Sequence, residues 1–190
     1  MTINLSIVVV VIACVCNAAG QVLRAEAGLV KKVDGEVLVH CHRSSPSLSE
    51  LRKGDVLHNE DLILTLKSGS AVFSLNPDSY VLVSADTALT VRETALSAMH
   101  FDVTAGEVIF TVSGLDDGAS LVFHAPPGVL KISKKGLYRL YVQPSGETQV
   151  NVIRGELIYT DNDNRPVRLT KGKQVEFRKR VTNSAERHQP

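Results

Sequence analysis

Cysteine is rare in this sequence, with three residues among 190. Cys14 and Cys16 lie together in the apolar N-terminal segment, so Cys41 has no partner left in the rest of the chain. One cysteine cannot form an internal disulfide, which excludes a disulfide-stapled scaffold. The chain must be held by its apolar core alone, and the roughly 170 residues after the N-terminal segment are enough for one self-standing domain.

A long apolar run is missing as well. The longest one, LSIVVVVIACVC from Leu5 to Cys16, has about 12 residues, whereas a helix that crosses a bilayer needs about 20. No charged residue precedes Arg24, and the small residues of Asn17 to Gly20 follow the run. This layout predicts a secretory signal peptide over residues 1–20, although MTINL at the start contains no Lys or Arg. A short anchor or a buried strand is the alternative.

Two ways of processing this segment stay open. Signal peptidase would cleave after Ala18 or Ala19 and release a soluble protein. Alternatively, residues 11–14, Val-Ile-Ala-Cys, resemble a bacterial lipobox, in which the cysteine carries lipid. Cys14 is then the candidate lipidation residue, and its acyl chains would anchor the protein without a membrane-spanning helix. In both cases we expect an exported protein that meets a membrane only through such an anchor.

A large excess of charge of either sign is also absent. The net charge is +1, and the C-terminal residues 178–190 contribute +3 of it. The rest of the chain therefore carries −2, which argues against a nucleic-acid partner, because phosphate backbones are bound by clusters of Lys and Arg. Residues 179–190 are expected to form a disordered basic tail. Such a tail is usually solvated, although its basic residues could touch anionic lipid or wall polymer.

The sequence also lacks a helical pattern of apolar residues longer than two turns. Its apolar residues alternate instead with a period of two residues. Successive side chains of a strand point to opposite faces, so this alternation indicates half-buried strands. Four runs place the following apolar residues on one face: Leu62, Leu64 and Leu66; Val108, Phe110 and Val112; Tyr138, Leu140 and Val142; Val150 and Val152. Turn residues separate such runs about every 8–12 residues, the spacing of sandwiches and barrels. The sequence therefore predicts a single all-β domain over residues 28–178.

One helical signal stands against this pattern. Residues 47–50, Ser-Leu-Ser-Glu, form a capping box ahead of Leu51. They predict one short helical turn and no longer helix.

Glycines recur at a fixed distance from apolar residues. Five of them stand three positions after a Leu or Val: Gly54, Gly69, Gly106, Gly155 and Gly172. We expect a strand to end at each place and a new one to start, because glycine accepts backbone conformations that a Cβ obstructs. Glu follows Gly at 35–36, 106–107 and 155–156, and it is expected on the solvent side of the new strand.

The same turns carry a family resemblance. Residues 51–57, Leu-Arg-Lys-Gly-Asp-Val-Leu, are similar to the L-x-x-G-D-x-L motif of the FecR domain, and residues 68–75 resemble the strand that follows it. Later stretches resemble further motifs of the family in the same order: 103–108, 125–128, 136–140, 150–157 and 169–174. The hairpin at 76–80 lacks the family's glycine, and 136–140 replaces its Thr and Phe. The resemblance runs from about Gly28 to Phe177.

The FecR resemblance implies a β-sandwich of jelly-roll type in the bacterial cell envelope, either periplasmic or envelope-associated. Full-length FecR regulators also carry a cytoplasmic segment that handles a sigma factor, followed by a membrane helix. In this chain only MTINL precedes the apolar run. We therefore expect the extracytoplasmic module without the sigma-regulating role.

Histidine and cysteine are concentrated at residues 40–42, His-Cys-His. In a strand, His40 and His42 share one face about 7 Å apart and could supply two metal ligands. Zinc needs three or four ligands, and no second pair with suitable spacing is present. We expect Cys41 in the core and the two histidines exposed. His58, His100 and His124 stand isolated in the sequence and are expected at the surface or at strand ends.

Other partial motifs also lack essential positions. The run Asp161-Asn162-Asp163 begins like a calcium loop, but Pro166 and Gly172 occupy the positions where Gly and Glu are needed. Gly172-Lys173 lacks the earlier glycine of a P-loop. Gly118-Ala119-Ser120 lacks the second glycine of a nucleophile elbow. We expect no catalytic, cofactor-binding or metal-binding residues.

These observations favour a non-enzymatic FecR-domain protein that acts as a binding or interaction module of the cell envelope. Its partner is an unidentified envelope protein or polymer, and its oligomeric state stays open. The first alternative is an extracytoplasmic component of a FecR-type transmembrane signalling system that senses an outer-membrane partner. The second, on fold analogy alone, is a carbohydrate-active enzyme on a jelly-roll scaffold.

Overall fold

The computed structural model describes residues 27–42, 47–76, 78–95, 97–115 and 118–178. Strands make up all of the regular secondary structure in these residues, which confirms the all-β prediction. The strands are β1 Val30–Asp34, β2 Val37–His40, β3 Leu48–Glu50, β4 Leu62–Thr65, β5 Ser70–Asn76, β6 Ser79–Val83, β7 Ala88–Ala95, β8 Ala98–Val112, β9 Ser120–Ala125, β10 Gly128–Ile132, β11 Gly136–Val142, β12 Thr148–Arg154, β13 Glu156–Asp161, β14 Pro166–Thr170 and β15 Gln174–Phe177. No membrane-spanning helix is found within the described ranges.

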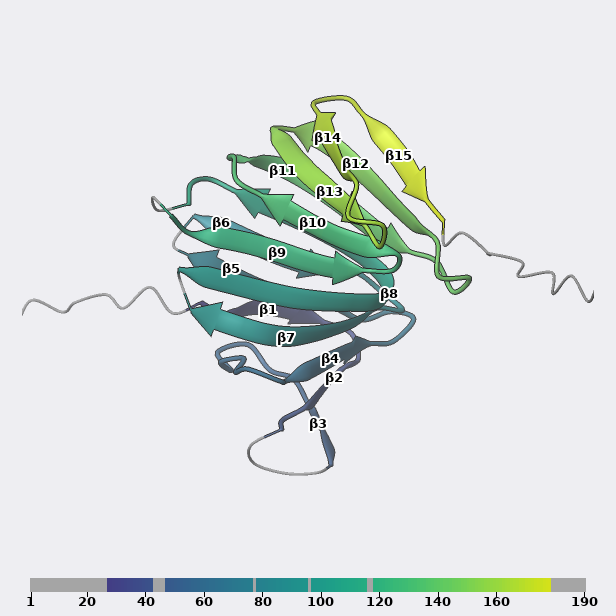
Figure 1. The fold of residues 1–190 in the computed structure, drawn as a ribbon. Coiled ribbons are helices and arrows are strands. Elements are labelled where there is room, and N and C mark those ends of the chain that lie inside the picture. The colour runs from purple at the N-terminus through teal and green to yellow at the C-terminus, as the bar shows by residue number, and fades with distance from the viewer. Residues whose placement is uncertain (1–26, 43–46, 77, 96, 116–117, 179–190) are drawn as a thin grey trace, which may run out of the picture.

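The strands are arranged in two facing layers that share one strand. One layer has the order β3-β2-β4-β7-β8-β9-β10-β13-β14, and the other has the order β1-β5-β6-β8-β11-β12-β15. Every pairing is antiparallel except that of β8 with β9. Apart from β3, which lies outside β2 at one end of the first layer, the strands of both layers follow chain order, so the chain progresses from one end of the molecule to the other (Figure 1).

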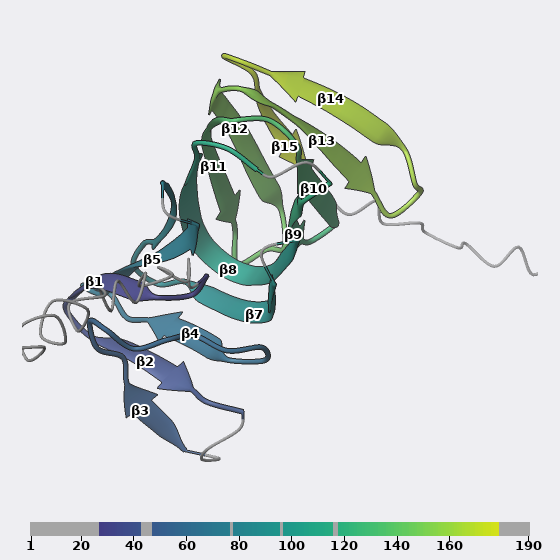
Figure 2. The same ribbon diagram turned by 90° about the vertical axis from the view of Figure 1, so that its left-hand side faces the viewer.

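The long strand β8 joins the two layers. Its first half pairs with β7 and β9, and its second half, from Gly106 onward, pairs with β6 and β11. Figure 2 shows β8 curving beneath the C-terminal strands, with β9, β10 and β13 opposite β11 and β12. Because pairing continues through β8, the described strands form one 15-stranded sheet. The predicted sandwich of jelly-roll type is therefore not confirmed, although the all-β class is.

Gly106 lies where β8 passes from one layer to the other. Its φ is +86°, and a Cβ there would lie 2.3 Å from the Thr87 hydroxyl and 2.5 Å from the Asp86 carbonyl oxygen. Only glycine fits such a close approach at that backbone angle. The prediction that a strand ends at Gly106 is wrong, because the same strand continues through the bend.

A chain of aromatic rings fills the space between the layers. Neighbouring ring centroids are 5.6 Å apart for Phe73 and Phe101, 5.3 Å for Phe101 and Phe123, 4.3 Å for Phe123 and Phe110, and 5.2 Å for Phe110 and Tyr138. All five side chains are buried, and such pairs contribute about 0.5–1.5 kcal/mol each beyond their buried area. The apolar faces predicted for Val108 to Val112, Tyr138 to Val142 and Val150 to Val152 do point into this core.

The face predicted for Leu62, Leu64 and Leu66 is wrong. Leu66, just after β4, is 39% exposed, whereas Ile63 and Thr65 of β4 are buried. Thr65 can be buried because its hydroxyl donates to the Ser84 carbonyl at 2.5 Å and accepts from the Thr87 amide at 2.9 Å. Alternation could not reveal this, because residues 62–64 are all apolar and both faces of the run look alike.

The helical turn predicted at residues 47–50 is also wrong. Residues Leu48–Glu50 form β3, which pairs antiparallel with β2. Pairing with a neighbouring strand satisfies the backbone there and overrides the local capping signal. The predicted signal peptide with Cys14 and the predicted tail at 179–190 both lie outside the described residues.

The turn in the L-x-x-G-D-x-L stretch has the expected form. Leu51 and Leu57 are each 2% exposed, so both leucines belong to the core. Gly54 between them has φ +95°, and the Asp55 carboxylate accepts the Arg52 amide at 2.8 Å. The buried side chains of Leu51 and Leu57 thus hold the turn at Gly54 against the core.

Candidate functional site

Three turns lie side by side on one lateral edge of the C-terminal half. They join β10 to β11, β12 to β13, and β14 to β15. The register places Ile132 opposite Leu157, Leu137 opposite Arg154 and Glu156 opposite Thr170, so the three turns meet at the same ends of their strands. Seven basic side chains belong to these turns and the strand positions beside them: Lys131, Lys134, Lys135, Arg154, Arg168, Lys171 and Lys173. We call this set the basic edge.

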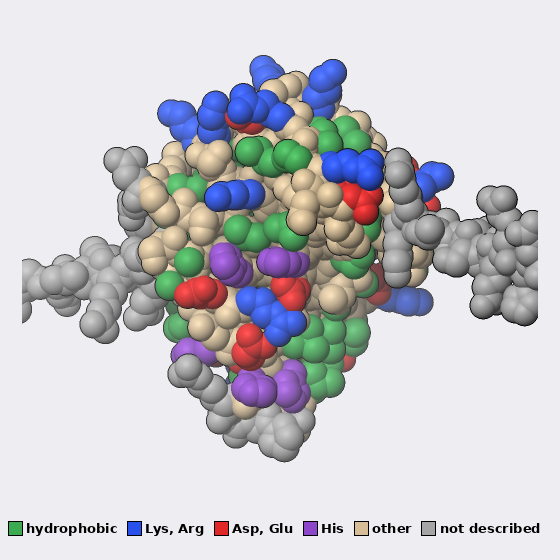
Figure 3. Space-filling view, viewed as in Figure 1, with side chains coloured by type: hydrophobic (Ala, Val, Ile, Leu, Met, Phe, Trp, Pro, Cys, Tyr) green, Lys and Arg blue, Asp and Glu red, His purple; other side chains and the backbone are tan. Residues whose placement is uncertain are grey.

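Most of the positive charge of the basic edge is not neutralised. Glu156 is the carboxylate that contacts it, with its Oε1 3.4 Å from Lys134 Nζ and 3.6 Å from Arg168 Nη1. The other five cations have no ion pair with any described residue. In Figure 3, Lys and Arg side chains gather at the upper end of the molecule. Residues 128–178 carry ten Lys and Arg against five Asp and Glu, whereas residues 28–95 carry seven against nine.

The buried hydroxyl of Tyr138 holds the basic edge in shape. It shares its proton between the carbonyl oxygens of Lys134 at 2.8 Å and Glu156 at 3.0 Å, and it accepts the Glu156 amide at 3.1 Å. Two of the three turns are therefore tied to one side chain. Burial raises the pKa of Tyr138, because the phenolate would be poorly solvated there.

Two glycines make room for that hydroxyl. A Cβ at Gly136 would lie 2.6 Å from it, and a Cβ at Gly155 would lie 2.3 Å from it and 2.7 Å from the Lys135 carbonyl oxygen. Gly155 also has φ +95°, which side-chain-bearing residues rarely adopt. The backbones of Lys135 and Gly155 are thus packed together, which brings Lys135 close to Arg154.

A hollow opens in the surface at this place. It has a volume of about 350 Å³ and is lined by Thr111, Val112, Ser113, Lys135, Gly136 and Arg154. We call it the edge hollow. Its polar lining consists of two hydroxyls and two cations, with no carboxylate among the lining residues.

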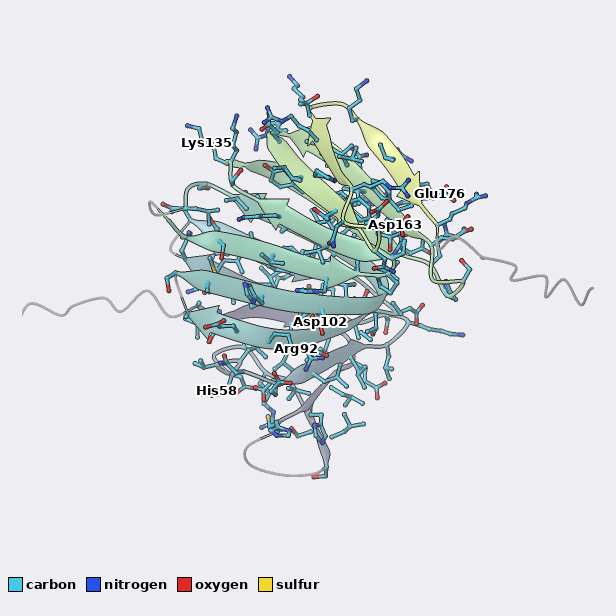
Figure 4. The ribbon with its side chains drawn as sticks, viewed as in Figure 1. His58, Arg92, Asp102, Lys135, Asp163 and Glu176 are labelled. Atoms are coloured by element: carbon cyan, nitrogen blue, oxygen red, sulfur yellow. The ribbon has the colours of Figure 1, made fainter. Side chains whose placement is uncertain are left out.

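On the opposite lateral edge of the C-terminal half, unlike the basic edge, charged side chains of both signs pair with one another. Its turns at 126–127, 143–147 and 162–165 surround a hollow of about 340 Å³. Asp163 pairs with Arg165 at 2.8 Å, and Arg178 pairs with Glu176 at 2.7 Å and Glu147 at 3.0 Å. The Arg178 hydrogen bond lowers the pKa of Glu176. Figure 4 shows Lys135 on one edge and Asp163 and Glu176 toward the other.

Charges on the outer face of the N-terminal half also neutralise one another. Arg92 pairs with Glu60 at 2.5 Å and with Asp102 at 2.6 Å, and the hydrogen bond to Asp102 raises the pKa of Arg92 (Figure 4). His100 lies 3.9 Å from Glu93 and its ring is 6.5 Å from that of His124. His100 and His124, which stand apart in the sequence, are thus neighbours in the fold, because β8 and β9 pair in parallel.

The histidine and cysteine positions singled out in the sequence do not converge. Cys41 is partly buried and packs against the core, His40 is partly buried, and His42 is exposed. Asp161 accepts the amides of Asp163 at 3.0 Å and Arg165 at 2.9 Å, which makes residues 161–165 a self-contained turn. No group of three or more potential metal ligands occurs in the part of the chain that the structure describes.

Comparisons with known proteins give limited similarity. No family model and no curated protein matches the chain. Two crystal structures of a protein described as a "putative anti-sigma factor" from Parabacteroides distasonis ATCC 8503, at 2.50 Å and 1.65 Å resolution, are similar in part, at 17% and 16% identity with TM-scores of 0.49. The similarity covers 61% of this chain and 58% of that protein. The FecR resemblance therefore rests on the motifs in the sequence.

Proposed function

We propose that this protein is a non-enzymatic binding module of the bacterial cell envelope and that its basic edge binds an acidic polymer. The observation that supports the proposal most directly is the basic edge itself, where seven cations face one carboxylate. The cations are spread over three turns that lie side by side, which suits a ligand with repeated negative charges better than a single compact anion.

The strength of such binding follows from many small terms. One exposed ion pair contributes only about 0.2–1 kcal/mol, and salt screens it over roughly 10 Å at 0.1 M ionic strength. Several cations acting together on one polymer add up to useful affinity. We therefore expect binding that is strong at low salt and weakens steeply as salt is added.

The experiment is calorimetric titration of the full chain with polygalacturonate, with polyphosphate, and with neutral dextran. Lys171→Glu with Lys173→Glu should weaken binding of both polyanions at least about tenfold, which corresponds to about 1.4 kcal/mol. The matched control is Lys53→Glu with Lys67→Glu, two exposed lysines outside the basic edge, which should change binding by less than about threefold. Equal loss in both variants, or no polyanion binding at low salt, contradicts the proposal.

Export is part of the proposal, and the N-terminal chemistry tests it. Mass spectrometry of the protein from its host should find either an acylated Cys14 or a mature start near Ala19. Intact full-length protein in the cytoplasm would contradict export.

A second candidate function is the extracytoplasmic part of a FecR-type signalling system. It is supported by the way in which the motif residues Leu51, Gly54 and Leu57 build one turn of the core. Cross-linking in intact cells should then capture an outer-membrane protein, and deletion of the gene should change transcription that depends on a sigma factor. Unchanged transcription after deletion counts against this role.

A further inference from the structure

We propose that the edge hollow is a subsite for one acidic sugar, held by its phosphate or carboxylate group. This inference rests on the proposed function and names the unit of the polymer that is recognised. It begins from the donors that line the hollow: the ammonium group of Lys135, the guanidinium of Arg154 and the hydroxyl of Thr111.

The fourth polar residue of the lining, Ser113, is hydrogen-bonded within the protein, so its hydroxyl proton is not available to a ligand. Its hydroxyl donates to the Asp78 carbonyl at 2.6 Å, and its amide donates to the Ser79 hydroxyl at 3.0 Å. The end of β8 is thereby tied to the start of β6. Ligand binding is left to Lys135, Arg154 and Thr111, which form no hydrogen bond to an acidic side chain of a described residue.

Two cations placed close together favour an anion between them. Lys135 and Arg154 come from neighbouring turns whose backbones are packed together at Gly155. The Tyr138 hydroxyl bonds to the backbone of Lys134 and Glu156, so the backbones of the two turns that carry these cations are fixed before a ligand arrives. Arg binds phosphate and carboxylate groups through two parallel hydrogen bonds, and a prearranged site loses less entropy on binding.

The surroundings of the hollow point to a sugar as the carrier of the anionic group. Its volume of about 350 Å³ leaves room beyond a single oxyanion. Tyr80 lies directly opposite Thr111 on the adjacent strand β6, and 37% of its surface is exposed. Directly opposite residues on paired strands have Cβ atoms about 4.5–5.5 Å apart, so the Tyr80 side chain starts beside Thr111, although Tyr80 is not one of the residues that line the hollow. An aromatic ring beside an anion site suits the apolar face of a sugar ring.

The test is a ¹⁵N NMR titration of the full chain with glucuronate, glucose 6-phosphate, inorganic phosphate and neutral glucose. The acidic sugars should bind with dissociation constants on the order of 1 mM and shift the amides of residues 111–113, 135–136 and 154. Glucose should shift none of them. Preference between glucuronate and glucose 6-phosphate tells which acidic group the site takes. Absence of shifts with both acidic sugars overturns the inference.

Three variants separate this subsite from the rest of the basic edge. Arg154→Gln should weaken both acidic sugars at least about fivefold, and Lys171→Gln with Lys173→Gln should leave them within about twofold while weakening polygalacturonate. Tyr80→Ser should weaken glucose 6-phosphate about threefold and leave inorganic phosphate unchanged. Thermal unfolding of each variant checks that it is folded.

The two proposals fail in different ways. If polygalacturonate binds and is lost in the Lys171 and Lys173 variant, but the acidic sugars do not bind, the subsite is wrong and the basic edge stands. If the acidic sugars bind through Arg154 and the polymers do not bind, the subsite stands and the polymer function is wrong. If Arg154→Gln binds the acidic sugars as the wild type does, the hollow is not the site.

Discussion

The two lateral edges of the C-terminal half use the same device with different results. On each edge a fully buried tyrosine hydroxyl lies against a glycine: Tyr138 against Gly136 and Gly155, and Tyr159 against Gly128. The Tyr138 hydroxyl has three backbone partners, whereas the Tyr159 hydroxyl has none among the described residues. The comparison indicates that the basic edge is built to hold its turns in one arrangement and that the other edge is built less tightly.

The largest expected effect is that of Gly155→Ala. The new Cβ would enter the space of the Tyr138 hydroxyl and the Lys135 carbonyl at a φ of +95°. We expect a loss of about 3 kcal/mol in the free energy of unfolding, measured by urea denaturation. The polymer binding of any folded variant should fall as well, because the turns that carry Lys135 and Arg154 would move apart.

Gly146→Ala on the opposite edge is the matched control. Gly146 also has a positive φ, +82°, but nothing lies within 4 Å of its added Cβ. The loss there should be about 1 kcal/mol, the conformational term alone. Equal losses at the two glycines would show that the packing against Tyr138 does not matter.

Tyr138→Phe comes second in size. It removes the hydroxyl that ties Lys134 to Glu156 and leaves the Glu156 amide without that acceptor. An unpaired buried donor or acceptor costs about 1–3 kcal/mol, and urea denaturation should show a loss in that range. A loss below about 0.5 kcal/mol would mean that water replaces the hydroxyl at no cost.

A fall in stability at alkaline pH is the third expectation. Burial raises the pKa of Tyr159 to about 12, above the ordinary tyrosine value of 10.0, and the pKa of Tyr138 is raised as well. A raised native pKa means that the stabilisation is fully present below pH 10 and is lost as the pH rises toward 12. Each tyrosine can contribute at most about 1.4 kcal/mol per pH unit in that window. Urea denaturation at intervals between pH 9 and pH 12 measures the fall, and an unchanged midpoint throughout contradicts it.

Tyr159→Phe should have the smallest effect at neutral pH, and in the opposite direction. It deletes a buried hydroxyl that has no partner among the described residues, while the ring can keep its stack on Phe177, with the ring centroids 3.5 Å apart. The free energy of unfolding should stay unchanged or rise by up to about 1 kcal/mol. A loss as large as that of Tyr138→Phe would show that the two edges are equivalent and would remove the comparison.

Sequence patterns predicted the fold class well because alternation and turns are local. Runs such as Val108 to Val112 alternate strictly, and their inward residues are buried as expected. The face of Leu62 to Leu66 could not be read, because apolar side chains occupy both faces of that run and the partners of Thr65 come from 19 and 22 residues away.

The candidate site was much harder to predict than the fold. Its cations are scattered between Lys131 and Lys173, and a whole-chain charge of +1 conceals them. The excess of basic residues in 128–178 was the available signal. Even that excess does not show that three turns share one edge, since the antiparallel register of β10 to β15 decides it.

The amino-acid sequence by itself determined that strands would form, where glycine had to stand and which faces of the regular runs would be buried, because these depend on neighbours within a few residues. Only the tertiary structure decided that β8 would serve both layers and that Lys135 and Arg154 would come together over Tyr138. Such juxtapositions depend on pairing between residues far apart in the chain, and short-range patterns carry no information about which strands will pair.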